Sequence, residues 1–275
     1  MPVASGRYCA IDGELDFVVP CSIGAQHNSM ERSGHLATLE AVTVRSLGDS
    51  PMTLATTPPS ATITDPPLDQ WLPTTWDEFL TIANDPTAPP DRRSYYYNGR
   101  MRFEMTPLDH DHARQNLPPA DIVAFYALVR QMRVVRYLNV SLRKTGVQEC
   151  QPDLSVYVGD RPEWPPKGNE PIDLDRFGPP DLVVEVGSSS FNDDLGPKRL
   201  LYEQLGVREY WVINANERQV IAFAIADRGS RAIEESQVLP GLSMAIVAEA
   251  LERTDRNDDA DTIRWLMEQF QAIDS

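Results

Sequence analysis

The segment from Pro179 to Asn214 constrains the fold more than any other part of the chain. It begins with the apolar run Leu182–Val186, which has the length of a buried strand and carries one carboxylate, Glu185, in its middle. A helix-forming stretch follows, and a second apolar run, Tyr210–Ile213, closes the unit. An acid inside an apolar strand is costly unless it is paired or binds a cation, so Glu185 is a candidate site residue.

Lys198 falls on the inner face of the intervening helix. One face of that helix carries four residues at helical spacing: Leu195, Lys198, Tyr202 and Leu205. Pro197 is acceptable in a first helical turn, and Gly206 supplies the C-terminal stop. A lysine among apolar neighbours needs a partner, and Glu185 on the preceding strand is the expected one. The alternative is a lysine whose stem packs on the sheet while its ammonium reaches water.

Asp153 is a second candidate carboxylate. Its surroundings, Gln151–Gly159, echo Pro179–Gly187, with Pro-Asp before an apolar run and Gly after it. The echo predicts two adjacent strands that enter the sheet alike, with Asp153 and Glu185 at neighbouring strand ends. Mg²⁺ is bound by one or two carboxylates together with water and substrate phosphate. Taken singly, Asp153 or Asp181 is equally an ordinary turn or cap residue.

Periodicity and turn chemistry predict the remaining elements. Asn98-Gly99 is a typical two-residue hairpin turn. The predicted elements are a helix at 75–80, a hairpin at 95–105, a long amphipathic helix at 119–138, strands at 154–158 and 220–226, a hairpin loop at 214–217, and helices at 243–251 and 260–271.

Residues 1–70 differ from the rest of the 275-residue chain. They mix short apolar pieces with Ser, Thr, Pro and Gly and lack periodicity, which predicts a poorly structured N-terminal extension before a domain at 71–275. Alternatively, translation starts at Met52 and the extension is not native.

The sequence also indicates in which cellular compartment the protein is expected. No run of roughly 18 apolar residues occurs, so no membrane helix is expected. The N-terminus lacks the basic and apolar regions of a secretory signal. The three cysteines are scattered, which favours a reduced, cytoplasmic protein: Cys9, Cys21 and Cys150.

The net charge of −16 disfavours non-specific binding to nucleic acid, although a local basic groove is compatible with it. Basic residues recur every three positions on the predicted long helix and continue beyond it: Arg130, Arg133, Arg136, Arg143 and Lys144. They predict a strip that follows phosphates, with a solvated helix face as the alternative.

Four motifs carry a family resemblance: NGRMRFEMTP (98–107), QPDLSVYVGD (151–160), PPDLVVEVGSSS (179–190) and DLGPKRLLYEQLGVREYWVIN (194–214). From about residue 76 to residue 271 the chain resembles the Uma2 family, also called DUF820, which is common in cyanobacteria. That family belongs to the PD-(D/E)XK superfamily of restriction-endonuclease-like nucleases. The resemblance implies an α/β fold with a central mixed sheet of roughly five or more strands flanked by helices.

The resemblance also implies a site that binds Mg²⁺ or Mn²⁺. Asp153 matches the aspartate of the PD motif, and Glu185 matches the acidic residue of (D/E)XK. The backbone carbonyl of Val186 is a further expected metal ligand. The sequence departs from the generic pattern at Gly187, where the superfamily has its lysine, and Lys198 on the following helix takes that role.

Three weaker candidates lie nearer the N-terminus. Glu104 corresponds to an acidic residue that can touch a second metal, with a half-exposed strand residue as the alternative. His110 and His112 occupy a predicted loop before the long helix, where family members often carry a histidine. These histidines are metal-ligand candidates, and loop residues without a ligand role are the alternative.

The function expected from these residues is a divalent-metal-dependent endonuclease that acts on DNA, or secondarily on RNA. A homodimer would suit cleavage of two strands, because it supplies two sites related by symmetry. The rival interpretation is a catalytically inactive interaction protein that keeps the nuclease fold. The strong negative charge and Gly187 favour this rival, whereas the complete set of Asp153, Glu185 and Lys198 favours the enzyme.

Overall fold

The computed structural model of the chain describes residues 66–106, 110–187, 190–256 and 258–273. The chain divides into two compact units, Met1–Pro59 and Ser60–Ser275, and every described residue belongs to the second. The predicted extension up to residue 65, with the alternative start at Met52, lies outside the described residues. No helix in the described part of the chain combines the length and apolar character that a membrane span requires.

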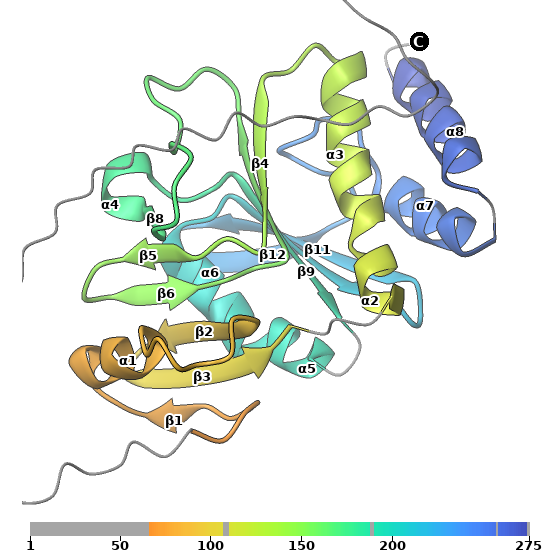
Figure 1. The fold of residues 1–275 in the computed structure, drawn as a ribbon. Coiled ribbons are helices and arrows are strands. Elements are labelled where there is room, and N and C mark those ends of the chain that lie inside the picture. The colour runs from red at the N-terminus through yellow and green to blue at the C-terminus, as the bar shows by residue number, and fades with distance from the viewer. Residues whose placement is uncertain (1–65, 107–109, 188–189, 257, 274–275) are drawn as a thin grey trace, which may run out of the picture. The chain divides into compact units, whose positions relative to one another are not determined.

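Two six-stranded mixed sheets form the framework of the second unit (Figure 1). In order across the first sheet, the strands are β1 (Leu72–Pro73), β3 (Arg100–Met105), β2 (Arg92–Tyr97), β6 (Gln148–Cys150), β5 (Leu142–Lys144) and β8 (Ile172–Asp173). The second sheet runs β12 (Gly229–Ile233), β11 (Gln219–Ala226), β10 (Glu209–Asn214), β9 (Leu182–Gly187), β7 (Leu154–Val158) and β4 (Val134–Leu138).

Helices flank the second sheet on both faces (Figure 1). The described helices are α1 (Trp76–Ala83), which packs on the first sheet, α2 (His110–Gln115), α3 (Leu117–Val129), α4 (Leu174–Phe177), α5 (Phe191–Asp193), α6 (Arg199–Leu205), α7 (Met244–Arg256) and α8 (Asp259–Ala272). A wide helical turn, η1 (Asp194–Lys198), joins α5 to α6. The predicted α/β class with a mixed sheet between helices is therefore confirmed, with two sheets where one was expected.

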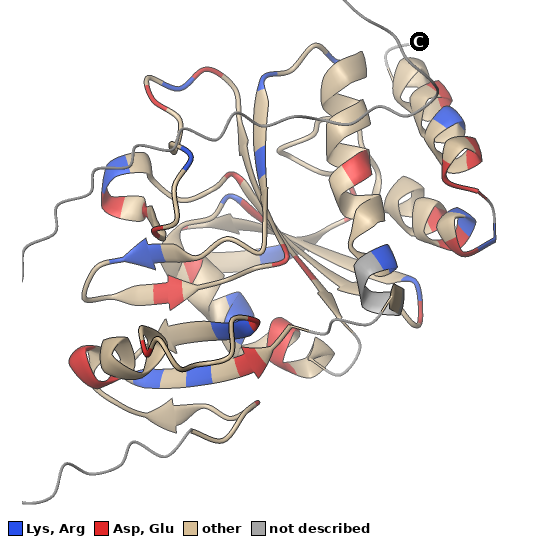
Figure 2. Ribbon diagram, in the orientation of Figure 1, with Lys and Arg blue, Asp and Glu red and all other residues tan. Residues whose placement is uncertain are grey.

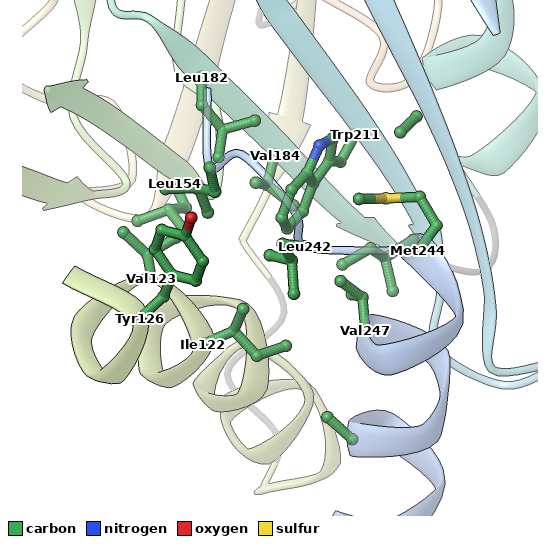
Figure 3. Close-up of a cluster of buried hydrophobic side chains, with 14 of the residues drawn as sticks. Ile122, Val123, Tyr126, Leu154, Leu182, Val184, Trp211, Leu242, Met244 and Val247 are labelled. Carbon is green, nitrogen blue, oxygen red and sulfur yellow. The ribbon is translucent and has the colours of Figure 1, made fainter. Parts of the chain in front are cut away.

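The main core lies between the second sheet and the helices α3, α7 and α8. Figure 3 shows Ile122 and Val123 of α3 and Val247 of α7 directed at the strand residues Val184 and Trp211. A second core on the opposite face of the sheet joins α6 to strands of the first sheet. The strands of the second sheet are thus apolar on both faces, as expected for strands covered on both sides.

Two predicted hairpins are confirmed. Asn98 and Gly99 connect β2 to β3, and both have positive φ angles, 50° and 70°, as a type I′ turn requires. The hairpin β10–β11 has its antiparallel register from Glu209 opposite Ala224 to Asn214 opposite Gln219. Both turns are set by local chemistry, which explains why sequence reasoning found them.

The predicted long helix at 119–138 is wrong in its second half. Helix α3 ends at Val129, Gln131 adopts a positive φ of 52°, and the chain continues as β4, antiparallel to β7. The β-branched pair Val134-Val135 and the neighbouring Tyr137 favour a strand once a sheet edge is available.

The predicted phosphate-binding strip is also wrong, because the helix that was to carry it ends at Val129. Arg130 caps the end of α3, whereas Arg133 precedes β4 and pairs with Asp160. Arg136 lies within β4 and donates to the carbonyl of Ala120. The three arginines therefore do not share a helix face.

Candidate active site

The two-residue period of β9 places Glu185 away from the main core. Leu182 and Val184 point toward α3 and α7, while Val183 belongs to the core on the opposite face. Side chains alternate along a strand, so Glu185 shares the face of Val183, toward α6 and the first sheet. Glu185 is only 2% exposed and is therefore a buried acid, as its sequence context predicted.

Asp153 lies opposite Glu185 in the sheet. Strands β7 and β9 pair antiparallel, with Leu154 opposite Val184 and Ser155 opposite Val183. One further step in this register sets Asp153 against Glu185. Residues directly opposite in an antiparallel pair are neighbours on the same face. The structure therefore brings together the two carboxylates that the sequence singled out.

The second Pro-Asp pair lies at the other end of the same strands. Because β7 and β9 are antiparallel, the prediction that the two echoing segments enter the sheet alike is wrong. Asp181 accepts from the backbone N–H of Val158 and pairs with Arg161 and Arg208. Asp181 is therefore a structural counterpart of Asp153 remote from Glu185.

The carboxylate of Asp153 is held from two sides. Its Oδ2 accepts from the backbone N–H of Val186 at 2.7 Å, and its Oδ1 accepts from Nη2 of Arg93 at 2.7 Å. Burial opposes the charge of Arg93, but the field of Asp153 raises the pKa of the guanidinium above its ordinary value. Sequence reasoning missed Arg93. The available signal was the two-residue spacing of Arg93 and Tyr95 in β2, which puts both side chains on the same, buried face.

Lys198 lies in a pocket of acidic groups. Its Nζ stands 3.0 Å from Oδ1 of Asp194, 3.1 Å from Oε2 of Glu104 and 3.8 Å from Oε1 of Glu185. It also lies 4.6 Å from the centroid of the Tyr95 ring. The side chain is 2% exposed, so the alternative of an ammonium that reaches water is wrong.

The wide turn η1 presents Lys198 to the cluster. The backbone is non-helical at Gly196, Pro197 follows, and α6 starts directly after Lys198. Asp194 opens this turn, four residues before Lys198, and was not singled out from sequence. The i, i+4 spacing of an acid and a lysine was the signal that could have found it.

Lys198 and Glu185 each shift the pKa of the other. Burial disfavours the ammonium of Lys198, but the acidic groups around it, Glu185 foremost, raise its pKa well above the ordinary value. Burial raises the pKa of Glu185 well above its ordinary value, against the opposing effect of Lys198. Asp194 and Asp153 raise it further. The hydroxyl of Tyr202 donates to Oε1 of Glu185 at 2.6 Å and fixes its orientation.

Glu104 joins the cluster from the end of β3. Its Oε1 accepts from Nε of Arg102 at 2.6 Å, and its Oε2 accepts from Lys198. Burial raises the pKa of Glu104, but Lys198 and Arg102 together lower it below the ordinary value. Glu104 is 8% exposed, so it is not the half-exposed strand residue of the alternative. Figure 2 shows acidic and basic segments meeting where β3 approaches α5 and the start of α6.

The residues present suit a hard divalent cation. Four carboxylates meet three basic side chains here: Glu104, Asp153, Glu185 and Asp194 with Arg93, Arg102 and Lys198. The donors are all carboxylate oxygens, and burial, with the neighbouring carboxylates Asp194 and Asp153, raises the pKa of Glu185. In the described part of the chain no three His, Cys, Asp or Glu side chains are grouped as a ready metal site. The opposed pair Asp153 and Glu185 matches the one or two carboxylates that Mg²⁺ usually takes, with water and phosphate completing its shell.

The structure describes the side chain of only one of the two histidine candidates. His110 begins helix α2, where a loop was predicted, and its side chain is exposed. The side chain of His112 lies outside the described residues. Their role as metal ligands stays a prediction.

An open cavity of about 510 Å³ lies beside the buried cluster. Six residues line it: Asp69, Arg102, Ser190, Asn192, Asp193 and Pro197. Two of these residues also contact the cluster. Arg102 donates to Glu104, and Ser190 donates to Oδ2 of Asp194 at 2.7 Å. The cavity therefore adjoins the buried cluster through Arg102 and Ser190.

Comparison with known proteins assigns this chain to a family. One solved structure, titled "Crystal structure of a putative nuclease belonging to DUF820" from Anabaena variabilis ATCC 29413, is 19% identical to this chain. The alignment covers 72% of this chain and 99% of that one, with a TM-score of 0.41. No functionally curated protein matches the chain. The profile of the Uma2 family, described as "Putative restriction endonuclease", matches residues 76–257, which include Glu104, Asp153, Glu185 and Lys198. Because this match spans more than half of the chain, the protein belongs to the Uma2 family.

Proposed function

We propose that this protein is a divalent-metal-dependent endonuclease that hydrolyses phosphodiester bonds, with Asp153 and Glu185 holding the metal. The observation that carries the proposal is the opposition of these two buried carboxylates across β7 and β9, with Lys198 within 3.8 Å of Glu185. Family membership supports a nuclease, and the description of the family supports DNA ahead of RNA as substrate.

Asp153 and Glu185 would hold Mg²⁺ or Mn²⁺, with the carbonyl of Val186 as a further ligand. The ion would lower the pKa of a bound water and offset negative charge on the phosphate. The Val186 N–H fixes Asp153, and the Tyr202 hydroxyl fixes Glu185, so both carboxylates are oriented before any ligand arrives. Such prior orientation is what a site needs in order to favour the transition state.

Lys198 acts in this proposal as a fixed positive charge. Its pKa is raised well above the ordinary value, so the amine keeps its proton and does not serve as a general base. Asp194 and Glu104 hold the ammonium from two sides. Lys198 would therefore orient the attacking water or offset charge on the phosphate, and Glu104 would act as its positioning residue rather than as a ligand of a second metal.

The net charge of −16 makes general attraction to a polyanion unfavourable. A divalent ion at the site and Arg102 in the adjacent cavity would supply local positive charge where the phosphate must come. We therefore expect weak binding to nucleic acid without metal and much stronger binding with it.

The test is cleavage of supercoiled plasmid, single-stranded DNA and RNA by the full chain with Mg²⁺, Mn²⁺ or EDTA. Glu185→Gln is the site variant, and Asp181→Asn is its matched control, because Asp181 is a buried aspartate at the other end of the same strand pair. The proposal expects metal-dependent cutting that Glu185→Gln abolishes and Asp181→Asn retains. Folded protein that cuts none of the substrates would favour the inactive interaction protein instead.

The cutting pattern also tests the expected homodimer. Direct conversion of supercoiled to linear plasmid would indicate two coordinated sites, whereas accumulation of nicked circles would indicate single sites acting alone.

A further inference from the structure

Arg93 occupies the position of a cation at the candidate metal site. Its Nη2 lies 2.7 Å from Oδ1 of Asp153, and the side chains of the two residues are 5% and 3% exposed. The other oxygen of Asp153 accepts from the Val186 N–H. Oδ1 is therefore the oxygen that Arg93 and an incoming metal ion would both require.

Neutral acceptors also hold the guanidinium of Arg93. Nη2 donates to Oδ1 of Asn139 at 2.6 Å, and Nε donates to Oγ1 of Thr106 at 2.9 Å. Both acceptors come from outside the cluster of carboxylates. If Asp153 turned toward a metal ion, the guanidinium would keep these two hydrogen bonds. Release of Asp153 would therefore not leave Arg93 as a buried cation without partners, which would be costly.

We propose that Arg93 is the resident counter-cation of Asp153 in the metal-free protein, and that a divalent ion and Arg93 compete for this carboxylate. The inference rests on the proposed function, because it takes Asp153 as a metal ligand. Arg93 then has two effects. It stabilises the buried aspartate when metal is absent, and it sets the divalent-ion concentration at which the site fills.

The size of the effect follows from the population of the paired state. When only a fraction of the molecules is competent to bind, the apparent affinity falls by that fraction. A pair present in roughly nine of ten molecules would weaken apparent metal affinity about tenfold. A neutral residue at position 93 would remove this competition.

The experiment is titration of the full chain with Mn²⁺ alone, followed by calorimetry, for wild type, Arg93→Gln and Arg92→Gln. Arg92 is the matched control, because it neighbours Arg93 on β2 but donates to the carbonyl of Ile82 and lies over the Phe103 ring. The inference expects Arg93→Gln to bind Mn²⁺ at least about tenfold more tightly than wild type. Arg92→Gln should bind like wild type. Equal or weaker binding by Arg93→Gln would overturn the inference, and so would absence of Mn²⁺ binding in both wild type and Arg93→Gln.

A second measurement covers the case in which Arg93→Gln does not fold. In wild-type protein with ¹⁵N-labelled arginine, saturating Mg²⁺ should shift the Nη–H signals of Arg93, which contact Asp153, assigned by their loss in Arg93→Lys. The signal of Arg92 should stay in place. An unchanged Arg93 signal would overturn the inference.

Plasmid cleavage measured in parallel separates this inference from the proposed function. Tighter Mn²⁺ binding by Arg93→Gln without cleavage by wild type would contradict the nuclease and support the role of Arg93. Cleavage by wild type without tighter binding by Arg93→Gln would contradict only the role of Arg93.

Discussion

The hydroxyl of Ser190 stands in the space that a Cβ atom at Gly187 would need. Gly187 is the position at which the (D/E)XK pattern has its lysine. Ser190 in turn donates to Asp194, which pairs with Lys198. Contacts therefore run from Gly187 through Ser190 and Asp194 to Lys198. Lys198 is the lysine that approaches Glu185 from the following helical segment. A side chain at 187 would therefore force the Ser190 hydroxyl to move and would disturb its hydrogen bond to Asp194.

Gly187→Ala should destabilise the protein by about 1–3 kcal/mol, because it overpacks the contact with Ser190. Urea unfolding measures the change. Ser190→Ala removes the hydroxyl that clashes, so the double variant should recover part of the loss. Strict additivity of the two single variants, or a Gly187→Ala protein as stable as wild type, would contradict this account.

Lys198→Met should lower the free energy of unfolding by about 3–5 kcal/mol. The substitution leaves buried Glu104 and Asp194 without their ammonium partner. Thermal and urea unfolding measure the loss. A variant that unfolds like wild type would show that the ion pairs add no stability and that Lys198 does not organise this cluster.

Glu185→Gln should leave the metal-free protein as stable as wild type or more stable. The introduced amide would keep an acceptor for Tyr202 and remove a charge that burial and the nearby Asp194 and Asp153 disfavour. The variant should also lose the rise in melting temperature that Mn²⁺ gives wild type, since a ligand that binds only folded protein stabilises it. A loss of several kcal/mol in metal-free buffer would instead make Glu185 a structural partner of Lys198.

Glu78→Gln should be less stable than wild type at neutral pH, and the difference should vanish in acid. Glu78 and Thr75 form a reciprocal capping box at the start of α1. The Thr75 backbone N–H, followed by its hydroxyl, lowers the pKa of Glu78 below the ordinary value of 4.5. A lowered pKa in the folded state gives stability that is complete above pH 4.5 and is lost as the pH falls through the folded value. Unfolding curves from pH 7 down to pH 3 measure this, and a constant difference would contradict it.

Local signals explain what the sequence predicted well. The Asn-Gly turn, the apolar runs of β7, β9 and β10, and the stop at Gly206 each depend on a few adjacent residues. The pair Asp153 and Glu185 was found because an acid beside or inside a buried strand is costly without a partner. The same reasoning does not hold for Glu209, an acid in β10 that is 0% exposed. Its carboxylate accepts from Trp211, Ser236 and two backbone N–H groups, so it is structural.

Tertiary context explains what the sequence did not reveal. The strand β4 follows α3 without a break in apolar periodicity, and only pairing with β7 decides its conformation. Arg93 and Asp194 reach the site from a hairpin and from the irregular turn at Gly196. No linear motif relates Arg93 to Asp153, 60 residues away, because their contact depends on how the first sheet packs against the second.

The central claim is that Asp153 and Glu185 together hold a divalent ion. Anomalous diffraction from crystals of the full chain soaked in Mn²⁺ tests it most directly. The account predicts a manganese peak within coordination distance of both carboxylates, about 2.0–2.1 Å if the ion binds like Mg²⁺. Arg93 should have moved from Asp153 in the same crystals. No peak at this pair in crystals that diffract well, or a peak bound elsewhere with Arg93 still on Asp153, would contradict the claim.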